Sequence, residues 1–436
     1  MNTAGTLQKK IDSKSIHLAV IGLGYVGLPL SLAFAKAGVK TTGIDIDPNR
    51  VAKIKKGISY IDDISDAELR EARSSYRFDA SAKFETLKKV DCAIICVPTP
   101  LGKTKQPDLS YVLSAVRSAA ENMPKGSLLV LESTTYPGTT EENVLPMVQK
   151  ITGCTIEKDF FLGFSPERVD PANKQFSISD IPKVTGGIGP NSSKLVRSLY
   201  SKAFKNVVPV SSAKTAEMVK LLENTFRSVN IGLINEMAMM CFTLGIDIWE
   251  VIGAAKTKPF GFMPFYPGPG IGGHCINIDP MYLAWKARVH GYEPRMIELA
   301  QSINDGMPKL VVERARLLLN GAKKPVKGSS ILILGMAYKK NVMDTRESPS
   351  IFVAEELVRE GASISYHDPH VATVRVAGKI IRSKAFTAAL LRAQDLVLIL
   401  TDHDKVDYPL LAKSKALVFD TRNAMKGVPS KNVAKL

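Results

Sequence analysis

The side chain with the most distinctive chemical setting is the thiol of Cys275. It follows Gly-Gly-His at 272–274, precedes Asp279, and lies in a loop-like segment dense in Pro, Gly and aromatic residues. Such a setting is unlike a protein core, and the thiolate is the reactive form of cysteine. Cys92 and Cys96 lie instead in an apolar run that predicts a buried strand. Cys275 is therefore a candidate nucleophile, with packing as a small buried residue as the alternative. The neighbouring histidine has no partner at metal-ligand spacing, so no metal site is expected.

Three other residues have side chains suited to moving protons or stabilising negative charge. Lys220 and Asn224 are four residues apart in a helical pattern, so they share one helix face. A lysine amine in a cleft stabilises an alkoxide, and a nearby amide helps to position it. Glu167, in Phe-Ser-Pro-Glu-Arg at 164–168, follows a strand-like run and is a candidate base. The alternatives are an exposed helix face for the first two residues and a paired surface charge for the glutamate.

Residues 22–27 read Gly-Leu-Gly-Tyr-Val-Gly between a strand-like run and a helical pattern. In that context the motif indicates a dinucleotide-binding turn. Gly22 makes the tight turn, Gly24 lets the backbone approach a pyrophosphate, and Gly27 allows close helix packing. The helix N-terminus supplies N–H donors to the phosphates. Asp45 ends the second strand, where an acid that binds the ribose is expected. No arginine stands immediately beside Asp45, so we expect NAD rather than NADP.

Two later loops follow apolar runs and are expected to line the same cofactor. They read Val-Pro-Thr-Pro at 97–100 and Glu-Ser-Thr-Thr-Tyr-Pro-Gly at 132–138. Hydroxyl groups there orient water or the nicotinamide ribose, and ordinary turn chemistry is the alternative. The predicted cofactor-binding residues are Gly22, Gly24, Tyr25, Val26, Gly27, Asp45, Arg50, Pro98, Thr99, Ser133 and Thr134.

The elements that position these residues follow an alternating order. Strand-like runs at 16–21, 39–44, 90–97, 127–131 and 160–164 alternate with helical patterns such as 28–37, which predicts a doubly wound α/β domain. A helical pattern over 213–255 predicts one long helix, or two helices broken near Gly245. Residues 256–273 then read as a loop, and its aromatic content favours a functional one.

A third region repeats the opening of the first. A strand-like run at 331–335 ends in Gly-Met-Ala-Tyr-Lys, but no complete G-x-G-x-x-G follows. This favours a nucleotide or nucleotide diphosphate over a second dinucleotide, and Arg346 is suited to clamp a phosphate. Further strand-like runs lie at 363–366, 396–400 and 416–419. We therefore expect a Rossmann NAD-binding domain at 1–212, a central helical domain with the cysteine loop at 213–326, and a Rossmann-like domain at 327–436.

Composition excludes several classes of protein. The 436 residues are 45% hydrophobic and 23% charged, which is typical of a globular protein. No apolar run is long enough for a membrane span, and the first 15 residues lack the apolar region of a signal peptide, so we expect a cytoplasmic protein. Five cysteines without a C-x-x-C pair predict neither a disulfide framework nor a structural zinc site. The net charge is +16, but the basic residues are scattered without interleaved aromatics, so no nucleic-acid partner is expected.

Taken in order, the motifs resemble those of the nucleotide-sugar 6-dehydrogenases, the family of UDP-glucose and GDP-mannose dehydrogenases. The resemblance covers residues 16–423 and rests on VIGLGYVGLPL (20–30), STTYPGTT (133–140), FSPER (164–168), the Lys220/Asn224 helix, GGHCINIDP (272–280) and GMAYKKNVMDTRESPS (335–350). It implies a four-electron oxidation. The sugar C6 alcohol loses a hydride to NAD, the Cys275 thiolate captures the aldehyde as a thiohemiacetal, a second NAD takes another hydride, and water hydrolyses the thioester.

The resemblance also implies roles for individual residues. Lys220 would stabilise the oxyanion with Asn224 beside it, Asp279 would hold a water or Lys220, and Glu167 and Thr134 would position or deprotonate the hydrolytic water. The expected substrate contacts are Glu167, Arg168, Lys220, Asn224, Lys258, Phe265, Tyr266, Gly268, Gly272, Lys339 and Arg346. Of these, Lys258 would reach into the site of a second subunit. The resemblance implies a homodimer formed through the central helices.

Within the family, YPGPGIGGHC at 266–275 looks like the branch that acts on UDP-N-acetylhexosamines, UDP-N-acetylglucosamine above all. The UDP-glucose branch usually has a lysine where this chain has Ile278, and a phenylalanine where it has Arg168. UDP-N-acetylmannosamine, UDP-N-acetylgalactosamine and UDP-glucose remain alternative substrates. A 3-hydroxyacid or 6-phosphogluconate type dehydrogenase is the rival enzyme class, but it makes one hydride transfer and needs no cysteine. A non-catalytic NAD- or nucleic-acid-binding protein is the rival outside enzymes.

Overall fold

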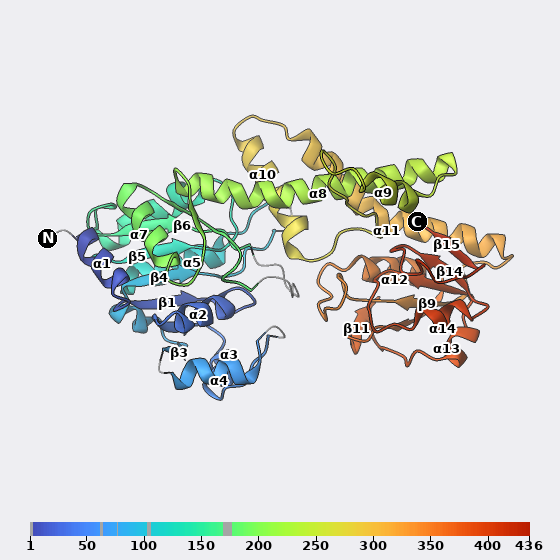
Figure 1. Ribbon diagram of the computed structural model, residues 1–436, viewed down its shortest axis with the longest axis horizontal. Helices are drawn as coiled ribbons and strands as arrows, with labels where there is room; N and C mark the ends of the chain where they lie inside the picture. Colours follow the sequence, from blue (N-terminus) through green and yellow to red (C-terminus); the bar gives the residue numbers. More distant parts are fainter. Residues whose placement is uncertain (1–2, 62–63, 76, 103–105, 169–176) are drawn as a thin grey trace. The chain divides into compact units, whose positions relative to one another are not determined.

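The computed structural model describes residues 3–61, 64–75, 77–102, 106–168 and 177–436, which fold into two compact units (Figure 1). The first unit runs to Glu223 and also takes in Met281–Gly291. The second comprises Asn224–Pro280 and Tyr292–Leu436. Each unit contains a mainly parallel sheet with helices packed on it, so the predicted α/β class is confirmed.

An eight-stranded sheet forms the first unit, in the order β3-β2-β1-β4-β5-β6-β7-β8. Neighbouring strands are parallel except β6 and β7. Both faces of the sheet are buried, as in β1, where Ala19 and Ile21 join one core cluster and Leu18 and Val20 another. The strand order reverses between β1 and β4, and doubly wound sheets bind dinucleotides at that point.

The elements of the first unit include the five predicted strands and the predicted helix at 28–37, each of which begins within two residues of its predicted start. They are α1 Thr3–Asp12, β1 His17–Ile21, α2 Gly27–Lys36, β2 Lys40–Ile44, α3 Pro48–Lys55, α4 Asp66–Ser74, β3 Phe78–Ser81, the 3₁₀ helix η1 Phe84–Lys89, β4 Cys92–Ile95, α5 Ser110–Asn122, β5 Leu128–Leu131, the π-helix η2 Thr140–Val144, α6 Leu145–Thr152, β6 Phe161–Phe164, β7 Lys183–Gly187, α7 Pro190–Tyr200 and β8 Val207–Pro209.

The second unit holds a five-stranded parallel sheet in the order β10-β9-β13-β14-β15. Its order reverses between β9 and β13, so this sheet has its own expected ligand position at their carboxyl ends. Its elements are α11 Arg295–Gly321, β9 Ser330–Leu334, α12 Pro349–Arg359, β10 Ser363–His367, the hairpin strands β11 Thr373–Val376 and β12 Lys379–Arg382, α13 Ala388–Arg392, β13 Leu396–Ile399, α14 Tyr408–Ala412, β14 Leu417–Asp420 and β15 Val433–Lys435.

Four helices, α8 to α11, lie between the two sheets in the sequence. The predicted break near Gly245 is confirmed: α8 spans Ala213–Leu244, Gly245 has φ +71°, and α9 spans Ile248–Ala255. A left-handed glycine at this position ends a helix. The border between the units falls within α8 and again within α10, His274–Val289. In α10 it coincides with Pro280, which cannot donate the helical hydrogen bond to the carbonyl four residues earlier.

The start of α10 corrects one sequence-based expectation. The cysteine motif predicts a loop through residue 275, but the helix begins at His274, so Cys275 lies in its first turn. Gly273, with φ +79°, forms the turn that precedes the helix. The run of Pro and Gly up to residue 273 hides this helix start, because it favours irregular backbone over the whole segment.

Candidate functional site

The glycine-rich turn between β1 and α2 has the geometry that its three glycines predict. Gly22 has φ +93°, and a Cβ placed there would lie 2.6 Å from the carbonyl oxygen of Cys96. A Cβ on Gly27 would lie 1.8 Å from the Gly22 carbonyl oxygen, so only glycine lets α2 start against the turn. A Cβ on Gly24 would meet no heavy atom within 4 Å. The turn therefore fits a pyrophosphate that approaches the backbone at Gly24.

Asp45 lies directly beside this turn. Its buried carboxylate accepts hydrogen bonds from the backbone N–H of Leu23 at 2.8 Å and of Asp47 at 2.9 Å. An arginine does stand beside it: the Arg50 Nη1 atom lies 3.4 Å from the Asp45 carboxylate. This corrects the expectation of no adjacent arginine, because the first turn of α3 carries Arg50 back over the strand end. The carboxylate that faces the turn still suits a ribose hydroxyl rather than a phosphate.

Two tyrosines outside the sequence motifs form hydrogen bonds to the loops that are expected to bind the cofactor. The Tyr60 hydroxyl donates to the Leu23 carbonyl at 2.6 Å. The Tyr282 hydroxyl, on α10, donates to the carbonyl of Thr99 at 2.7 Å. Ser133 is also used internally, since its hydroxyl donates to the Val97 carbonyl at 2.8 Å. Its single proton is therefore committed to the loop after β4, and Ser133 is left with acceptor capacity toward a ligand.

The other predicted residues of the cofactor group lie in the glycine-rich turn and in the loops after β4 and β5. Tyr25 is half exposed, Val26 directly precedes α2, and Thr134 is half-buried in the loop after β5. Pro98 lies in the loop after β4. All of them lie at the carboxyl edge of the central strands, where the cofactor is expected.

Glu167 follows β6 and belongs to a buried cluster of charged groups. One carboxylate oxygen lies 3.3 Å from the Lys183 ammonium, and the other accepts the backbone N–H of Arg168 at 2.8 Å. Lys183 also forms an ion pair with Glu132, whose second oxygen accepts the hydroxyl of Tyr200. Burial raises the pKa of Glu132 to about 8, opposed by Lys183 and increased further by Glu167. Sequence motifs miss this cluster because its members come from separate strands and a helix.

Lys220 and Arg168 are both held close to Glu167. The Lys220 ammonium donates to the Glu167 carbonyl oxygen at 2.7 Å. The Arg168 guanidinium makes a two-point ion pair with Glu223, at 3.2 Å and 2.6 Å, and donates to the Pro182 carbonyl. Arg168, an expected substrate contact, is therefore largely committed to protein partners.

Cys275, Asn224 and Asp279 belong to the second unit. Cys275 is exposed in the first turn of α10, where the partial positive charge of the helix end favours an anion. Asp279, four residues later, is buried and accepts a hydrogen bond from the Asn224 side-chain amide. By contrast, Cys92 and Cys96 lie on or just after β4, and burial raises the pKa of both thiols. The thiol with access to a substrate is therefore Cys275.

The glycines that precede Cys275 press against the C-terminal part of the chain. A Cβ on Gly272 would lie 2.5 Å from the Tyr338 Cβ, and one on Gly273 would lie 2.8 Å from the Tyr338 ring. The Gly273 N–H also donates to the carbonyl of Arg346 at 3.1 Å. Earlier in the loop, a Cβ on Gly268 would lie 2.4 Å from the Arg422 Nη1 atom. The small residues of this loop are thus required by close packing.

Arg422 is a further candidate for the site, and the sequence motifs miss it. It follows β14, its guanidinium is buried against the Gly268 backbone, and its Nε atom donates to the Leu400 carbonyl at 2.9 Å. An arginine directly after the carboxyl end of a parallel strand is the signal that identifies it. Gly268 is held on its other side by Asn235, whose side-chain oxygen accepts the Gly268 N–H at 3.0 Å.

The remaining predicted substrate contacts are divided between the aromatic loop and the loop after β9. Phe265 packs edge-on against Phe226, and Tyr266 stacks on Trp249. Arg346 is exposed, and its Nε and Nη2 atoms donate to Asp344, so the expected phosphate clamp already holds a carboxylate. Lys339 is half-buried, and Lys258 is exposed with its ammonium 5.2 Å from the centre of the Phe260 ring.

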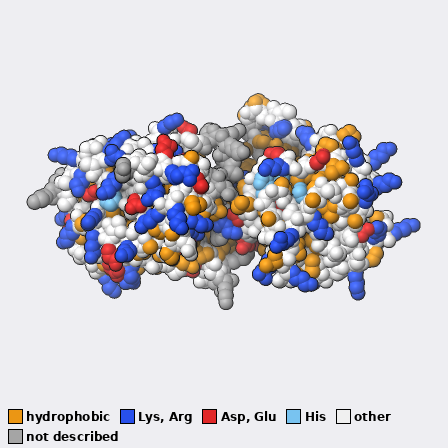
Figure 2. All heavy atoms as spheres, turned by 90° about the horizontal axis from the view of Figure 1, so that it is seen from below, with side chains coloured by type: hydrophobic (Ala, Val, Ile, Leu, Met, Phe, Trp, Pro, Cys, Tyr) orange, Lys and Arg blue, Asp and Glu red, His pale blue; other side chains and the backbone are white. Residues whose placement is uncertain are grey.

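Other classes of site find little support in the described residues. No helix among them is both long and apolar enough to cross a membrane. In the same part of the chain, no three His, Cys, Asp or Glu side chains are grouped closely enough to hold a metal ion. Figure 2 shows Lys and Arg side chains scattered over each unit on the face drawn.

The comparisons with known proteins agree with this geometry. The UDP-glucose/GDP-mannose dehydrogenase family profiles match in order: the NAD-binding domain at 16–204, the central domain at 214–306 and the UDP-binding domain at 332–427. A UDP-N-acetyl-D-glucosamine 6-dehydrogenase of Pseudomonas aeruginosa is 40% identical over 82% of this chain and 84% of its own. A UDP-N-acetyl-D-mannosamine dehydrogenase of Pyrococcus horikoshii is 35% identical over 95% and 97%.

A solved structure is similar over nearly the whole length. The UDP-D-ManNAc dehydrogenase from Pyrococcus horikoshii superposes with a TM-score of 0.87 at 33% identity, and covers 96% of this chain and 98% of its own. Together with the three matched domains, this similarity extends to the dinucleotide turn, the cysteine loop and the C-terminal sheet. The chain therefore belongs to the UDP-glucose/GDP-mannose dehydrogenase family of NAD-dependent nucleotide-sugar dehydrogenases.

Proposed function

We propose that this enzyme oxidises the C6 alcohol of a UDP-N-acetylhexosamine to the uronic acid, with Cys275 as the nucleophile. The observation that carries the proposal is the position of this exposed thiol, at the first turn of α10 and directly after a loop packed on the C-terminal domain. NAD, when bound at the turn of residues 22–27, supplies the hydride acceptor for each of the two oxidations. The residues of the turn fit it, since Gly24 is open to a ligand and Asp45 lies beside Leu23.

In the proposed reaction Cys275 forms a covalent bond to the substrate. Its thiolate adds to the carbonyl carbon of the C6 aldehyde, and the new C–S bond holds the intermediate as a thiohemiacetal. Loss of the C6 hydride and the hydroxyl proton leaves a thioester. Water then adds, the C–S bond breaks, and the products are the carboxylic acid and the free thiol. Covalent capture keeps the aldehyde in the site between the two oxidations.

Lys220, Asn224 and Asp279 are proposed to stabilise the oxyanion of these steps. Lys220 has three N–H groups, of which one donates to the Glu167 carbonyl, so the ammonium retains donors for a substrate oxygen. Asn224 lies one helical turn after Lys220 on α8. Its amide is oriented by Asp279, and a fixed donor stabilises developing charge better than a mobile one. Asp279 is therefore proposed to act through Asn224, in addition to the water or Lys220 that the family resemblance implies.

Glu167 and Thr134 are proposed to handle the hydrolytic water. The Glu167 carboxylate lies 3.3 Å from the Lys183 ammonium, and a carboxylate at the end of a strand is a candidate base. Thr134, half-buried in the loop after β5, supplies a hydroxyl that can orient the same water.

The UDP group is proposed to bind where the aromatic loop contacts the C-terminal domain. Gly268 packs against Arg422 and Gly272 against Tyr338, which brings this loop to the C-terminal domain, and Phe265 and Tyr266 offer aromatic faces. Lys339 and Arg422 supply positive charge for the diphosphate, and Arg346 adds to it if a phosphate replaces Asp344 as its partner. The family match to a UDP-binding domain at 332–427 supports this assignment.

The identity of the sugar rests on the similar proteins. Relatives that are 40% and 37% identical are UDP-N-acetyl-D-glucosamine 6-dehydrogenases, so we propose UDP-N-acetylglucosamine as the substrate. Several relatives at 33–35% identity are UDP-N-acetyl-D-mannosamine dehydrogenases, and that epimer is the second candidate.

We further propose a homodimer with three functional domains per chain. Phe226, Leu233 and Met240 recur every seven residues on α8 and are about half exposed, which supports burial against a second copy. Lys258 is proposed to reach the partner's site. The division at 212/213 and 326/327 agrees with the gaps between the family matches.

The test is the amount of NADH formed per molecule of limiting sugar nucleotide. UDP-N-acetylglucosamine, UDP-N-acetylmannosamine, UDP-N-acetylgalactosamine and UDP-glucose are compared in parallel. We expect two NADH per UDP-N-acetylglucosamine and slower oxidation of the others. One NADH per sugar would remove the thioester stage and the role of Cys275. Two NADH from another sugar alone would overturn only the choice of substrate, and none from any of the four would overturn the proposed activity.

A further inference from the structure

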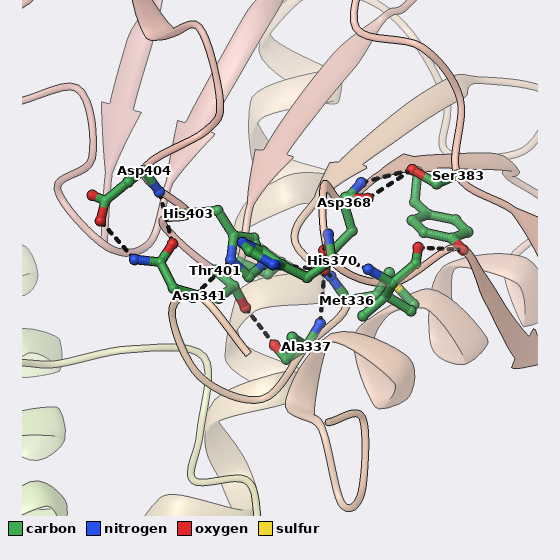
Figure 3. Close-up of polar contacts among 12 residues, drawn as sticks. Met336, Ala337, Asn341, Asp368, His370, Ser383, Thr401, His403 and Asp404 are labelled. Carbon is green, nitrogen blue, oxygen red and sulfur yellow. Dashed lines mark hydrogen bonds and ion pairs between the residues drawn. The ribbon is translucent and has the colours of Figure 1, made fainter. Parts of the chain in front are cut away.

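The loop Gly335–Asn341, which follows β9, is fastened at its beginning by groups from two neighbouring strand ends (Figure 3). Asp368, after β10, accepts the backbone N–H groups of Met336 at 2.7 Å and Ala337 at 3.0 Å on one carboxylate oxygen. The hydroxyl of Thr401, after β13, donates to the Ala337 carbonyl at 2.6 Å. Both ties are buried, so neither competes with solvent.

His403 fastens the other end of the same loop. Its Nδ1 atom accepts the backbone N–H of Asn341 at 2.9 Å, and its Nε2 atom lies 3.1 Å from the carboxylate oxygen of Asp368 that holds the start of the loop. An acceptor at Nδ1 requires the proton to be on Nε2, which donates to Asp368. One fully buried imidazole therefore links the two ends of the loop. Asn341 also exchanges hydrogen bonds with Asp404.

Asp368 has the same place in its sheet as Asp45 has in the first unit, since each follows the second strand of its fold and accepts N–H groups of the loop after the first. The use of the carboxylate differs. Besides the loop and His403, Asp368 accepts the N–H groups of His370 and Val371 on its other oxygen. Five donors saturate a carboxylate, so none of its lone pairs remains for a ribose. Burial acts against ionisation, but the hydrogen bonds outweigh it and lower the pKa of Asp368 to about 2.

The loop that this arrangement holds carries one residue of the proposed substrate site and one that packs on the cysteine loop. Tyr338 packs against Gly272 and Gly273, directly before the cysteine helix, and Lys339 follows it. The loop lies after β9, beside the end of β13, at the reversal of strand order where open α/β sheets bind their ligands. A shift of this loop would therefore move Lys339 and the packing surface of the cysteine loop together.

We propose that His403, acting with Asp368, is a positioning residue that sets the affinity of the enzyme for the UDP group through the loop Gly335–Asn341. The proposal rests on the assignment of UDP binding to this region. In this proposal His403 does not contact the substrate. Instead, it determines where Lys339 is held. The aspartate that would bind a ribose in a dinucleotide-binding domain serves here to fix a phosphate-binding loop.

The test uses three substitutions in the full-length enzyme. His403→Ala removes both hydrogen bonds, His403→Asn retains an acceptor near Nδ1, and His403→Gln retains a donor near Nε2. The readouts are the Kd for UDP by calorimetry and the kinetic constants for sugar nucleotide and NAD. We expect His403→Ala, which loses both hydrogen bonds, to weaken UDP binding about tenfold. His403→Asn and His403→Gln each lose one hydrogen bond and should weaken it about threefold. The KM for sugar should rise while kcat and the KM for NAD change less than the UDP affinity.

His367→Asn is the matched control. His367 is in the same sheet, and its ring bonds to the Lys384 carbonyl and stacks on Phe386; only its backbone carbonyl, which the substitution retains, contacts the loop, at the Gly335 N–H. This variant should bind UDP as the wild type does. Circular dichroism and thermal unfolding of all variants identify any that fail to fold. If His403→Ala does not fold, the two amide variants carry the test.

A double variant distinguishes positioning from general loss of structure. If His403 acts through Lys339, then His403→Gln should weaken UDP binding less than twofold in a Lys339→Ala background. Full additivity would overturn the proposal, as would unchanged UDP affinity in all folded His403 variants. Failure of the wild-type enzyme to bind UDP would instead overturn the assignment of the UDP site.

Discussion

Among the cysteines of the chain, exposure separates the candidate nucleophile from those that only pack. The sequence predicts this contrast from the apolar run around Cys92 and Cys96 and from the Gly-rich segment before Cys275. The structure agrees with it, since Cys92 is buried, Cys96 is partly buried and Cys275 is exposed. What the sequence does not predict is the helix start at His274. This helix start matters for the reactivity of Cys275, because the first turn of a helix favours the thiolate over the thiol.

Substitution of Cys275 tests the covalent stage directly. Cys275→Ala cannot form the thioester, so we expect no uronic acid and at most one NADH per sugar, with NAD affinity unchanged. The measurement is product analysis by mass spectrometry with NAD titration by fluorescence. Cys154→Ala, a buried cysteine of the first unit, is the control and should retain two NADH per sugar. Sustained uronic acid formation by Cys275→Ala would remove the thiol from the mechanism.

The buried charges behind Glu167 could not be predicted from the sequence. Glu132, Lys183 and Tyr200 come from β5, β7 and α7, and only the packing of those elements brings them together. Each residue in isolation reads as an ordinary charged or aromatic position. The site residues that the sequence does reveal lie in local motifs with a fixed spacing, such as residues 22–27.

Glu132 gives a pH dependence of stability with a definite sign. Its pKa is about 8 in the folded protein against 4.5 for an ordinary glutamate, so the folded state binds the proton more tightly. This contribution therefore lowers stability as pH rises from about 4.5 to about 8, by at most about 1.4 kcal/mol per pH unit. Glu132→Gln removes it. Thermal unfolding from pH 5 to 8 should show the variant gaining stability relative to the wild type as pH rises, whereas Glu121→Gln, at an exposed position, should show a constant difference.

At the level of elements, the loop before α10 combines tight packing with a strained backbone. Gly273 has φ +79°, and its missing Cβ makes room for the Tyr338 ring. The sequence predicts a functional loop at 256–273 from its length and aromatics. It cannot predict what the glycines contact, because Tyr338, Arg346 and Arg422 are more than 60 residues away in the chain.

Gly273→Ala tests this account of the loop. The added methyl group meets Tyr338, and the backbone angle is unfavourable for alanine, so we expect a loss of about 2 kcal/mol of stability and at least a tenfold fall in kcat/KM. Gly306→Ala is the control, because Gly306 is exposed in α11 and a Cβ there meets no atom within 4 Å. Helix propensity predicts that this control is about 0.5–1 kcal/mol more stable than the wild type. Equal activity of the two variants would contradict the packing argument.

Sequence patterns predict the long elements and the strands that end in functional loops. They miss the short strands. The strands at residues 17–21, 92–95 and 330–334 are mainly apolar and end at Gly or Pro signals, so they are readily identified, and the more polar strand at 40–44 is marked by Gly38 before it and Asp45 after it. β8, β15 and the hairpin β11–β12 contain polar or exposed residues and only three or four positions each. Such segments form strands because a neighbour pairs with them, which no local pattern records.

At the scale of the whole molecule, the exposed apolar residues of α8 lead to a prediction about assembly. Leu233 lies between Phe226 and Met240 at intervals of seven residues, and its side chain is 54% exposed. Leu233→Asp would place a charge in the proposed dimer interface. We expect a monomer in sedimentation experiments, with the unfolding of each chain little changed. Ile380→Asp, at an exposed apolar residue of β12, should leave the dimer intact, and a dimeric Leu233→Asp would exclude this face.

The packing of the cysteine loop also has a consequence for the order in which the molecule is made. Gly268 lies against Arg422, and Gly273 against Tyr338, so the loop reaches its final form only with partners that are synthesised later. The dinucleotide turn, by contrast, is complete once β1, β2 and β4 have formed. A chain emerging from the ribosome would therefore form its dinucleotide turn early, while its nucleophile stays unassembled until residue 422 has appeared. A chain stopped before residue 422 would have the dinucleotide turn without the means to form a thioester.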